Sequence, residues 1–172
     1  MAIREILLFP DPVLRRVARP VESFDEPLHS LVQDLAETMY HAPGVGLAAP
    51  QVGVELRVAV VDVAPRTPES RLHVLVNPRV VACEGRQSEE EGCLSIPGLS
   101  EKVDRPARVR VEAHTAAGER FELEGEGLLA RALCHEIDHL DGILFVDRLT
   151  GLRKELTHRR LRRLPYVQRA SA

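Results

Sequence analysis

Aromatic residues are scarce in this chain, which has 172 residues, 3% of them aromatic and none of them tryptophan. Hydrophobic residues still make up 44% of the sequence, so the core must be built mainly from Leu, Val, Ile and Ala. A chain of this length suits one domain and can bury a core without disulfide or metal support. We therefore expect residues 1–172 to form a single domain.

Long apolar runs and a large excess of charge are also missing. The run VAVV at residues 58–61 is far shorter than the roughly 20 residues that a membrane-spanning helix needs. The N-terminal segment contains Glu5 and Pro10 and resembles neither a secretory signal nor an Arg-rich transit peptide. The formal net charge of -3 gives no overall attraction to nucleic acid or membranes. We expect a cytoplasmic protein that contacts neither DNA nor a membrane.

Cysteine is rare as well, and the three cysteines form an odd set without regular spacing. This argues against a disulfide framework and leaves burial or metal ligation as the roles to consider. Cys83 and Cys134 are interpreted as small buried hydrophobic residues. Cys93 follows Gly92, a residue that lets the backbone approach another group closely, so both roles remain open for it.

The hydrophobic pattern alternates between helical and strand periods along the chain. Helices are predicted at residues 12–17, 28–39 and 127–140, strands at 56–63 and 72–78, a hairpin at 107–125, a basic helix at 151–164 and a tail at 165–172. Three glycines and two prolines interrupt regular structure at residues 43–54. Without regular βαβ alternation, the prediction is an α+β fold, with a mixed or antiparallel sheet packed on a central helix and a further C-terminal helix.

The predicted helix at 127–140 carries the sequence HEIDH at residues 135–139. Residues four apart share one helix face, so His135 and His139 can reach one metal ion while Glu136 reaches a water beside it. This is the spacing of metallohydrolases that use Glu as the general base. The alternative is an ordinary helix with polar residues on its solvent face. Because the helix is otherwise apolar, burial without a partner would be costly, which favours the metal.

A catalytic metal needs a third protein ligand and an open position. Asp141 and Asp147 follow the helix closely, and nothing distinguishes His158 in the basic helix. Cys93 offers a thiolate, a strong metal ligand. HEIDH alone also allows a zinc endopeptidase, although no clear downstream third ligand is visible. A structural zinc site is disfavoured, because such sites are usually closed by four ligands and need no adjacent base.

Three segments occur in order: GVGLAAPQ at 44–51, EGCLS at 91–95 and HEIDH at 135–139. Together they resemble the peptide deformylase family, and EGCLSIP with the short stretch after it is most similar to the Gram-negative branch. The resemblance extends from ILLFPDPVLR near the N-terminus to LFVDRL near residue 149. It implies a metal-dependent hydrolase that removes the formyl group from the N-terminal formyl-methionine of newly synthesised proteins.

The resemblance also implies roles for individual residues. Cys93, His135 and His139 would hold one divalent metal ion, Fe²⁺ natively, with Zn²⁺, Ni²⁺ or Co²⁺ able to replace it. Glu136 would be the catalytic base, assisted by the Gln51 side chain and the Leu94 backbone N–H at the oxyanion. The substrate, an N-formylmethionyl nascent peptide, would contact Val45, Gly46, Gly92, Leu128, Arg131 and Ala132.

Two residues depart from the family pattern. Cys134 stands where the family usually has Gln, which puts local packing in doubt more than metal ligation. Arg131 stands at a usually apolar place, one turn before His135, where its stem can lie along the apolar pocket wall with its charged end in water.

The helix predicted at 151–164 carries many cations in a chain that is otherwise acidic. It is interpreted either as a solvated helix face or as a contact with ribosomal RNA, whose phosphates attract Arg and Lys. A ribosome-associated factor that has lost catalysis is a further alternative. The presence of Gln51, Cys93 and Glu136 argues against it.

Overall fold

The computed structural model describes residues 2–170. Its elements are η1 (Pro12–Arg15), α1 (Glu26–His41), β1 (Gly46–Ala48), η2 (Ala49–Val52), β2 (Val58–Val61), β3 (His73–Glu84), β4 (Gln87–Cys93), β5 (Ile96–Arg105), β6 (Arg108–His114), β7 (Arg120–Glu126), α2 (Gly127–Leu140), η3 (Phe145–Arg148), α3 (Gly151–Arg162) and α4 (Pro165–Ala170). No helix within residues 2–170 has the length and apolar character needed to cross a membrane.

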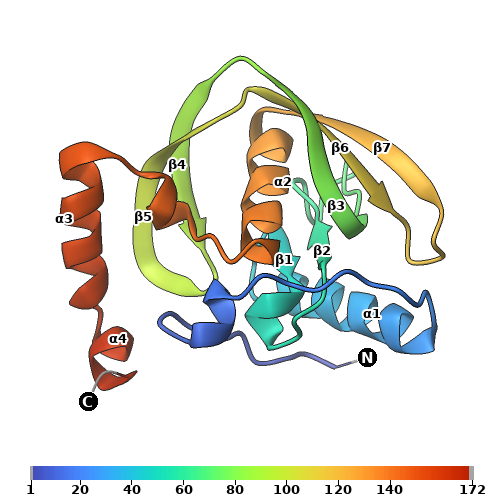
Figure 1. Cartoon of the computed structure of the whole chain (residues 1–172), viewed down its shortest axis with the longest axis horizontal. Coiled ribbons are helices and arrows are strands. Elements are labelled where there is room, and N and C mark those ends of the chain that lie inside the picture. The colour runs from blue at the N-terminus through green and yellow to red at the C-terminus, as the bar shows by residue number, and fades with distance from the viewer. Residues whose placement is uncertain (1, 171–172) are drawn as a thin grey trace.

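Two antiparallel sheets surround α2. One has five strands in the order β1-β2-β3-β6-β7, and the other is the hairpin β4-β5. Figure 1 shows α2 in the middle of the molecule, with β4 and β5 on one side and β3, β6 and β7 on the other. The predicted α+β fold, with its antiparallel sheet and central helix, is confirmed.

Helix α1 begins where its sequence favours a start. The Asp25 side chain accepts a hydrogen bond from the Leu28 backbone N–H at 3.3 Å, and Pro27 occupies the first turn. Its predicted apolar stripe is buried: Leu28, Leu31, Val32, Leu35 and Met39. This stripe packs on residues of β1 and β2, such as Leu47 and Val60, and so supports the segment that faces α2.

Helix α2 ends in a glycine turn, as predicted. Gly142 has a φ of 71°, and its N–H donates to the His139 carbonyl at 3.2 Å while the Ile143 N–H donates to the Asp138 carbonyl at 2.9 Å. This bonding pattern satisfies the last carbonyls of the helix. The turn therefore fixes the end of α2 directly after the second histidine of HEIDH.

Several local predictions are wrong. The first helix is only a short 3-10 turn, η1, that ends at Arg15. The segment 43–54 is not irregular throughout, because it contains β1 and η2. Residues 165–170 of the predicted tail form α4, and residues 171–172 lie outside the described part. Cys83 is exposed rather than buried. The prediction that Cys134 is buried is confirmed.

Candidate active site

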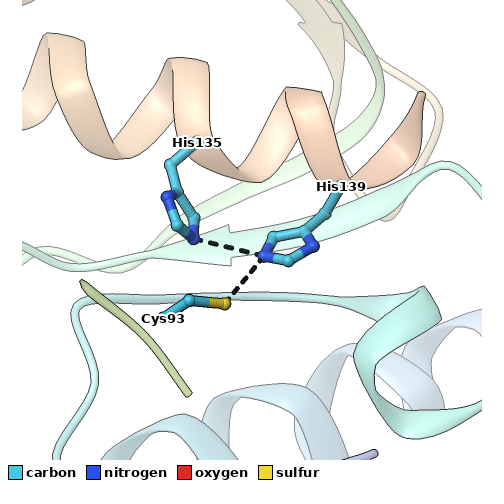
Figure 2. A group of neighbouring side chains, drawn as sticks. All are labelled: Cys93, His135 and His139. Carbon is cyan, nitrogen blue, oxygen red and sulfur yellow. Dashed lines mark hydrogen bonds between the residues drawn. The ribbon is translucent and has the colours of Figure 1, made fainter. Parts of the chain in front are cut away.

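The two histidines of α2 point at one place. Their Nε2 atoms lie 3.2 Å apart, and Cys93 Sγ lies 3.3 Å from His139 Nε2. All three ligand atoms lie within 4.8 Å of one another. Figure 2 shows both imidazoles leaving α2 toward the Cys93 side chain. Sequence spacing alone had placed the histidines together, and the end of β4 brings the cysteine to them.

These residues fit a divalent metal ion. One sulfur and two imidazole nitrogens are the donor set that zinc and related metals bind in proteins. Burial and the neighbouring His135 hold the pKa of the His139 imidazole well below its ordinary value, so this ring stays neutral and its nitrogen can act as a ligand. Both histidines are buried, which makes the cluster costly without a bound cation.

An ion-pair network orients the His135 ring through Nδ1, the nitrogen that does not face Cys93 and His139. Its Nδ1 donates to Glu91 Oε1 at 2.6 Å, which leaves Nε2 free to face Cys93 and His139. Arg105 donates to both oxygens of Glu91, at 3.1 and 2.7 Å. Burial would raise the pKa of Glu91, but the hydrogen bonds from His135 and Arg105 outweigh it and lower the pKa to about 2. Glu91 is therefore a charged carboxylate that fixes the His135 ring.

The network continues toward the C-terminal part of the chain. Arg105 also donates to Asp138 at 2.6 Å, and Arg148 donates to the two oxygens of Asp138 at 3.0 and 2.5 Å. The site residues predicted from the sequence do not include Glu91, Arg105 or Asp138. The acidic run at 89–91 directly before Cys93 and the Asp inside HEIDH were the available signals.

The side chain of Glu136 extends from α2 toward Gly46 of β1. Its side chain is buried, and Oε2 has no hydrogen-bond partner among the described residues. Burial raises the pKa of this carboxyl to about 7, the range in which one group can both take and give a proton near neutral pH. A Cβ on Gly46 would stand 2.3 Å from Glu136 Oε1. The absence of a side chain at Gly46 thus makes room for the carboxyl.

Gln51 is held in one orientation. Its Oε1 accepts a hydrogen bond from the Ala48 N–H at 2.9 Å. Its Nε2 donates to Ser95 Oγ at 3.1 Å and contacts Cys93 Sγ at 3.6 Å. The amide N–H group is therefore directed at the metal cluster. Leu94 follows Cys93 in the turn between β4 and β5, next to the same cluster.

A cavity of about 430 Å³ opens onto these groups. Every predicted site residue except His139 lines it. The predicted lining residues are Val45, Gly46, Gln51, Gly92, Cys93, Leu94, Leu128, Arg131, Ala132, His135 and Glu136. The predicted site residues do not include the wall that β5 supplies, residues 96–99. The cavity joins three ligand atoms that could hold a metal ion, a carboxyl of near-neutral pKa and an apolar wall, an arrangement suited to binding and hydrolysing an amide.

Residues 3–155 match the sequence profile of the family described as Polypeptide deformylase. The chain belongs to this family. A peptide deformylase of Acidobacterium capsulatum is 50% identical over 164 residues, covering 95% of this chain and 96% of that protein. The crystal structure of the Legionella pneumophila peptide deformylase has a TM-score of 0.88, 48% identity and 98% coverage of both chains. A plant peptide deformylase structure has a TM-score of 0.92 at 36% identity, covering 100% of this chain and 94% of that one.

Membership in the family fixes the reaction. Deformylases are metal-dependent hydrolases that remove the N-terminal formyl group from newly made proteins, and so this chain is a hydrolase that acts on formylated nascent peptides. The family match covers all three sequence segments that suggested the resemblance. It ends at residue 155, inside α3, so the distal part of the basic helix lies beyond it.

Proposed function

We propose that residues 1–172 form one catalytic domain in which Cys93, His135 and His139 hold the metal of the deformylase reaction. The observation that carries this proposal is the convergence of the three ligand atoms within 4.8 Å, directly beside Glu136. N-formylmethionyl nascent peptides bind in the adjoining cavity. Because these peptides arise at ribosomes, the protein works in the cytoplasm, and neither DNA nor membranes are partners.

The reaction follows from the positions of the chain's own groups. The metal, when bound, makes water a better nucleophile at neutral pH and polarises the formyl carbonyl. Glu136 accepts a proton from the attacking water and then delivers it to the departing amine. The Gln51 amide and the Leu94 N–H stabilise the negative charge that develops on the formyl oxygen.

The cavity walls hold the substrate for this attack. Val45, Leu128 and Ala132 supply apolar surface for the methionine side chain and exclude water from it. Gly46 and Gly92 let the extended peptide approach the backbone closely, because neither has a side chain.

The native metal is Fe²⁺, which Zn²⁺, Ni²⁺ or Co²⁺ can replace. The Cys-His-His ligand set suits zinc at least as well as iron, and zinc stands above iron in general affinity. A thiolate beside a redox-active metal is also open to oxidation. We expect elemental analysis after aerobic purification to find mostly zinc or nickel. Iron-dominated protein under those conditions would contradict this expectation.

The decisive test is formate release from a formyl-Met tripeptide by anaerobically purified protein loaded with Fe²⁺. We expect Glu136→Gln to retain its metal and lose activity by a factor of about 10² or more, since general acid–base catalysis contributes that much. Internal cleavage of unformylated peptides would instead indicate a zinc endopeptidase. Folded, metal-loaded protein without either activity would favour the non-catalytic ribosome factor.

The basic surface of α3 is proposed to contact ribosomal RNA. Its cations are Arg153, Lys154, Arg159, Arg160, Arg162 and the adjoining Arg163. Arg160 pairs with Glu101 at 2.6 Å and Arg153 donates to the Lys102 carbonyl at 3.2 Å. Arg159 and Arg162 are exposed. Exposed cations of this kind bind phosphates in a strongly salt-dependent way.

The double variant Arg159→Glu/Arg162→Glu should reduce co-sedimentation with ribosomes at low salt. Arg19→Glu/Arg71→Glu changes the net charge equally at two other exposed positions and is the matched control. Equal co-sedimentation of wild type and the α3 variant would exclude the contact.

A further inference from the structure

Arg131 is a cation on the wall of the substrate cavity, and the described residues offer it no partner of opposite charge. No carboxylate within residues 2–170 forms a salt bridge with it, and its Nε is buried without a hydrogen-bond acceptor. An enclosed donor without an acceptor destabilises the protein, because it loses its hydrogen bonds to water and gains none in return. An acceptor brought by a bound molecule would remove that cost.

Two acidic residues that line the same cavity already have hydrogen-bond partners. Glu91 accepts hydrogen bonds from Arg105 and His135. Glu90, which lines the same cavity, accepts a hydrogen bond from Ser100 Oγ at 2.6 Å. The Arg131 guanidinium is therefore available to pair with an anionic group of a molecule bound in the cavity.

The position of Arg131 on α2 sets which part of a peptide it meets. Arg131 lies four residues before His135 on the same helix face, a separation of about 6 Å along the axis. An extended peptide advances about 3.4 Å per residue. Consider a substrate peptide that has its formyl group at the metal ligands and runs along α2 toward Arg131. Its second or third residue then lies level with Arg131.

We propose that Arg131 is a specificity residue that favours formyl-peptides with an acidic side chain at the second or third position. The guanidinium pairs with the incoming carboxylate, and both charges lie in a partly enclosed cavity where water screens them less than at an open surface. The inference rests on the proposed function, because it assumes that the cavity binds the formylated peptide.

The test measures kcat/KM for formyl-Met-Ala-Ala-amide, formyl-Met-Glu-Ala-amide and formyl-Met-Ala-Glu-amide. The readout is the ratio of the better acidic peptide to the neutral peptide, so a general change in activity cancels. We expect this ratio to be about three- to tenfold higher for wild type than for Arg131→Met, which keeps the apolar stem and removes the charge. Arg131→Lys should give an intermediate ratio, because it retains charge without the planar fork.

Two further measurements separate the outcomes. The wild-type ratio should fall as salt is raised, since salt screens the charge pair. Arg19→Met removes a cation outside the cavity and should keep the wild-type ratio. Equal ratios for wild type and Arg131→Met would overturn the role of Arg131 while leaving deformylation intact. No formate from any peptide by metal-loaded wild type would overturn both this inference and the function on which it rests.

Discussion

Gly46 shows how one missing side chain shapes the proposed catalytic site. A Cβ at this position would lie 2.3 Å from Oε1 and 2.8 Å from Cδ of Glu136, so Gly46→Ala must displace the carboxyl. Misplacing a catalytic group by about 1 Å can cost about 10²-fold in rate. We expect kcat/KM for formyl-Met peptides to fall by at least about tenfold while the protein keeps its metal.

Gly44→Ala is the comparison for that change. A Cβ on Gly44 would meet Leu94 Cδ1 at 2.7 Å, and this is the flexible end of a side chain that can move aside. Gly44→Ala should therefore lower kcat/KM by less than Gly46→Ala does. An equal or greater loss would show that the space beside Glu136 is not what Gly46 provides.

Glu91 is the residue that links the metal cluster to the rest of the ion-pair network. Glu91→Gln keeps the shape of the side chain but removes the charge that accepts from His135 and Arg105. Partners of this kind typically contribute 10- to 100-fold in metal affinity. We expect the affinity for Zn²⁺, measured by competition with a chelator, to fall by about that factor.

Glu89→Gln is the control, because Glu89 is an exposed residue of the same strand. Its effect on Zn²⁺ affinity should be small. If both variants bound Zn²⁺ as tightly as wild type, the hydrogen bond to His135 would have no role in holding the metal.

At the scale of elements, the turn that follows α2 packs against η1 in the N-terminal segment. A Cβ on Gly142 would lie 2.5 Å from the Arg15 carbonyl oxygen, in a backbone conformation with a φ of 71°. Gly151 has a similar φ of 57° but open space around it. Alanine at either position costs about 1–2 kcal/mol, because a residue with a Cβ disfavours the left-handed backbone conformation. Only Gly142→Ala adds a clash with the backbone.

We therefore expect Gly142→Ala to lower the free energy of unfolding by more than Gly151→Ala, by about 1 kcal/mol or more. Urea unfolding of the two variants and wild type measures this difference. Equal losses would mean that η1 moves away from α2 without cost.

The contrast between α2 and β4 shows what the sequence can predict. Helix α2 has a strong apolar period and a terminal glycine, so its bounds and the pairing of His135 with His139 follow from local pattern. Strand β4 reads QSEEEGC and is largely exposed, with no alternation of apolar residues. It is a strand because its backbone pairs with β5, and a register shift lies between Gly92 and Cys93. Such long-range pairing leaves little trace in local sequence.

The same limit applies to the site. The proposed metal ligands and Glu136 could be chosen from the sequence because their spacing and the family resemblance are visible in the chain. The network of Glu91, Arg105 and Asp138 forms only where the β4–β5 hairpin packs beside α2. Arg131 was visible as a departure from the family pattern, but its unpaired state appears only in three dimensions.

At the scale of the whole molecule, the core consists of several clusters that are mainly aliphatic. One cluster joins α2 to β2, β3 and β6 through residues such as Leu133 and Val111. Another joins β5, η3 and α3 through Ile96, Phe145 and Leu161. The expected core of Leu, Val, Ile and Ala is thus present, with few aromatic residues in it. Each charge that is buried in this apolar core needs hydrogen bonds or an ion pair to offset its lost hydration.

Asp62 is such a charge, fully buried at the end of β2. It accepts hydrogen bonds from Tyr40 Oη at 2.8 Å, Ser70 Oγ at 2.6 Å and the Ala64 N–H at 3.0 Å. Burial alone would raise the pKa of this carboxyl, but these hydrogen bonds outweigh burial and lower the pKa below its ordinary value. The folded protein therefore binds the proton less readily than the unfolded chain does.

Because the pKa of Asp62 is lowered on folding, acid should weaken the contribution of this residue to stability. A carboxyl with a lowered folded-state pKa stabilises the fold above its unfolded pKa of about 4, and the contribution is lost as the pH falls through the folded pKa. Asp62→Asn cannot titrate, so its free energy of unfolding should be lower by about 1–3 kcal/mol at pH 7. The difference from wild type should shrink as the pH drops below about 4.

Urea unfolding of wild type and Asp62→Asn across this pH range tests the prediction, since contributions of the other groups cancel in the difference. Asp104→Asn is the control: the pKa of Asp104 is also lowered, by hydrogen bonds from Ser88 and Arg86, but this residue is exposed and water screens its interactions. Its difference from wild type should be small at every pH. A difference for Asp62→Asn that stayed constant through acid would mean that Asp62 stabilises the fold by its shape and hydrogen bonds, without its charge.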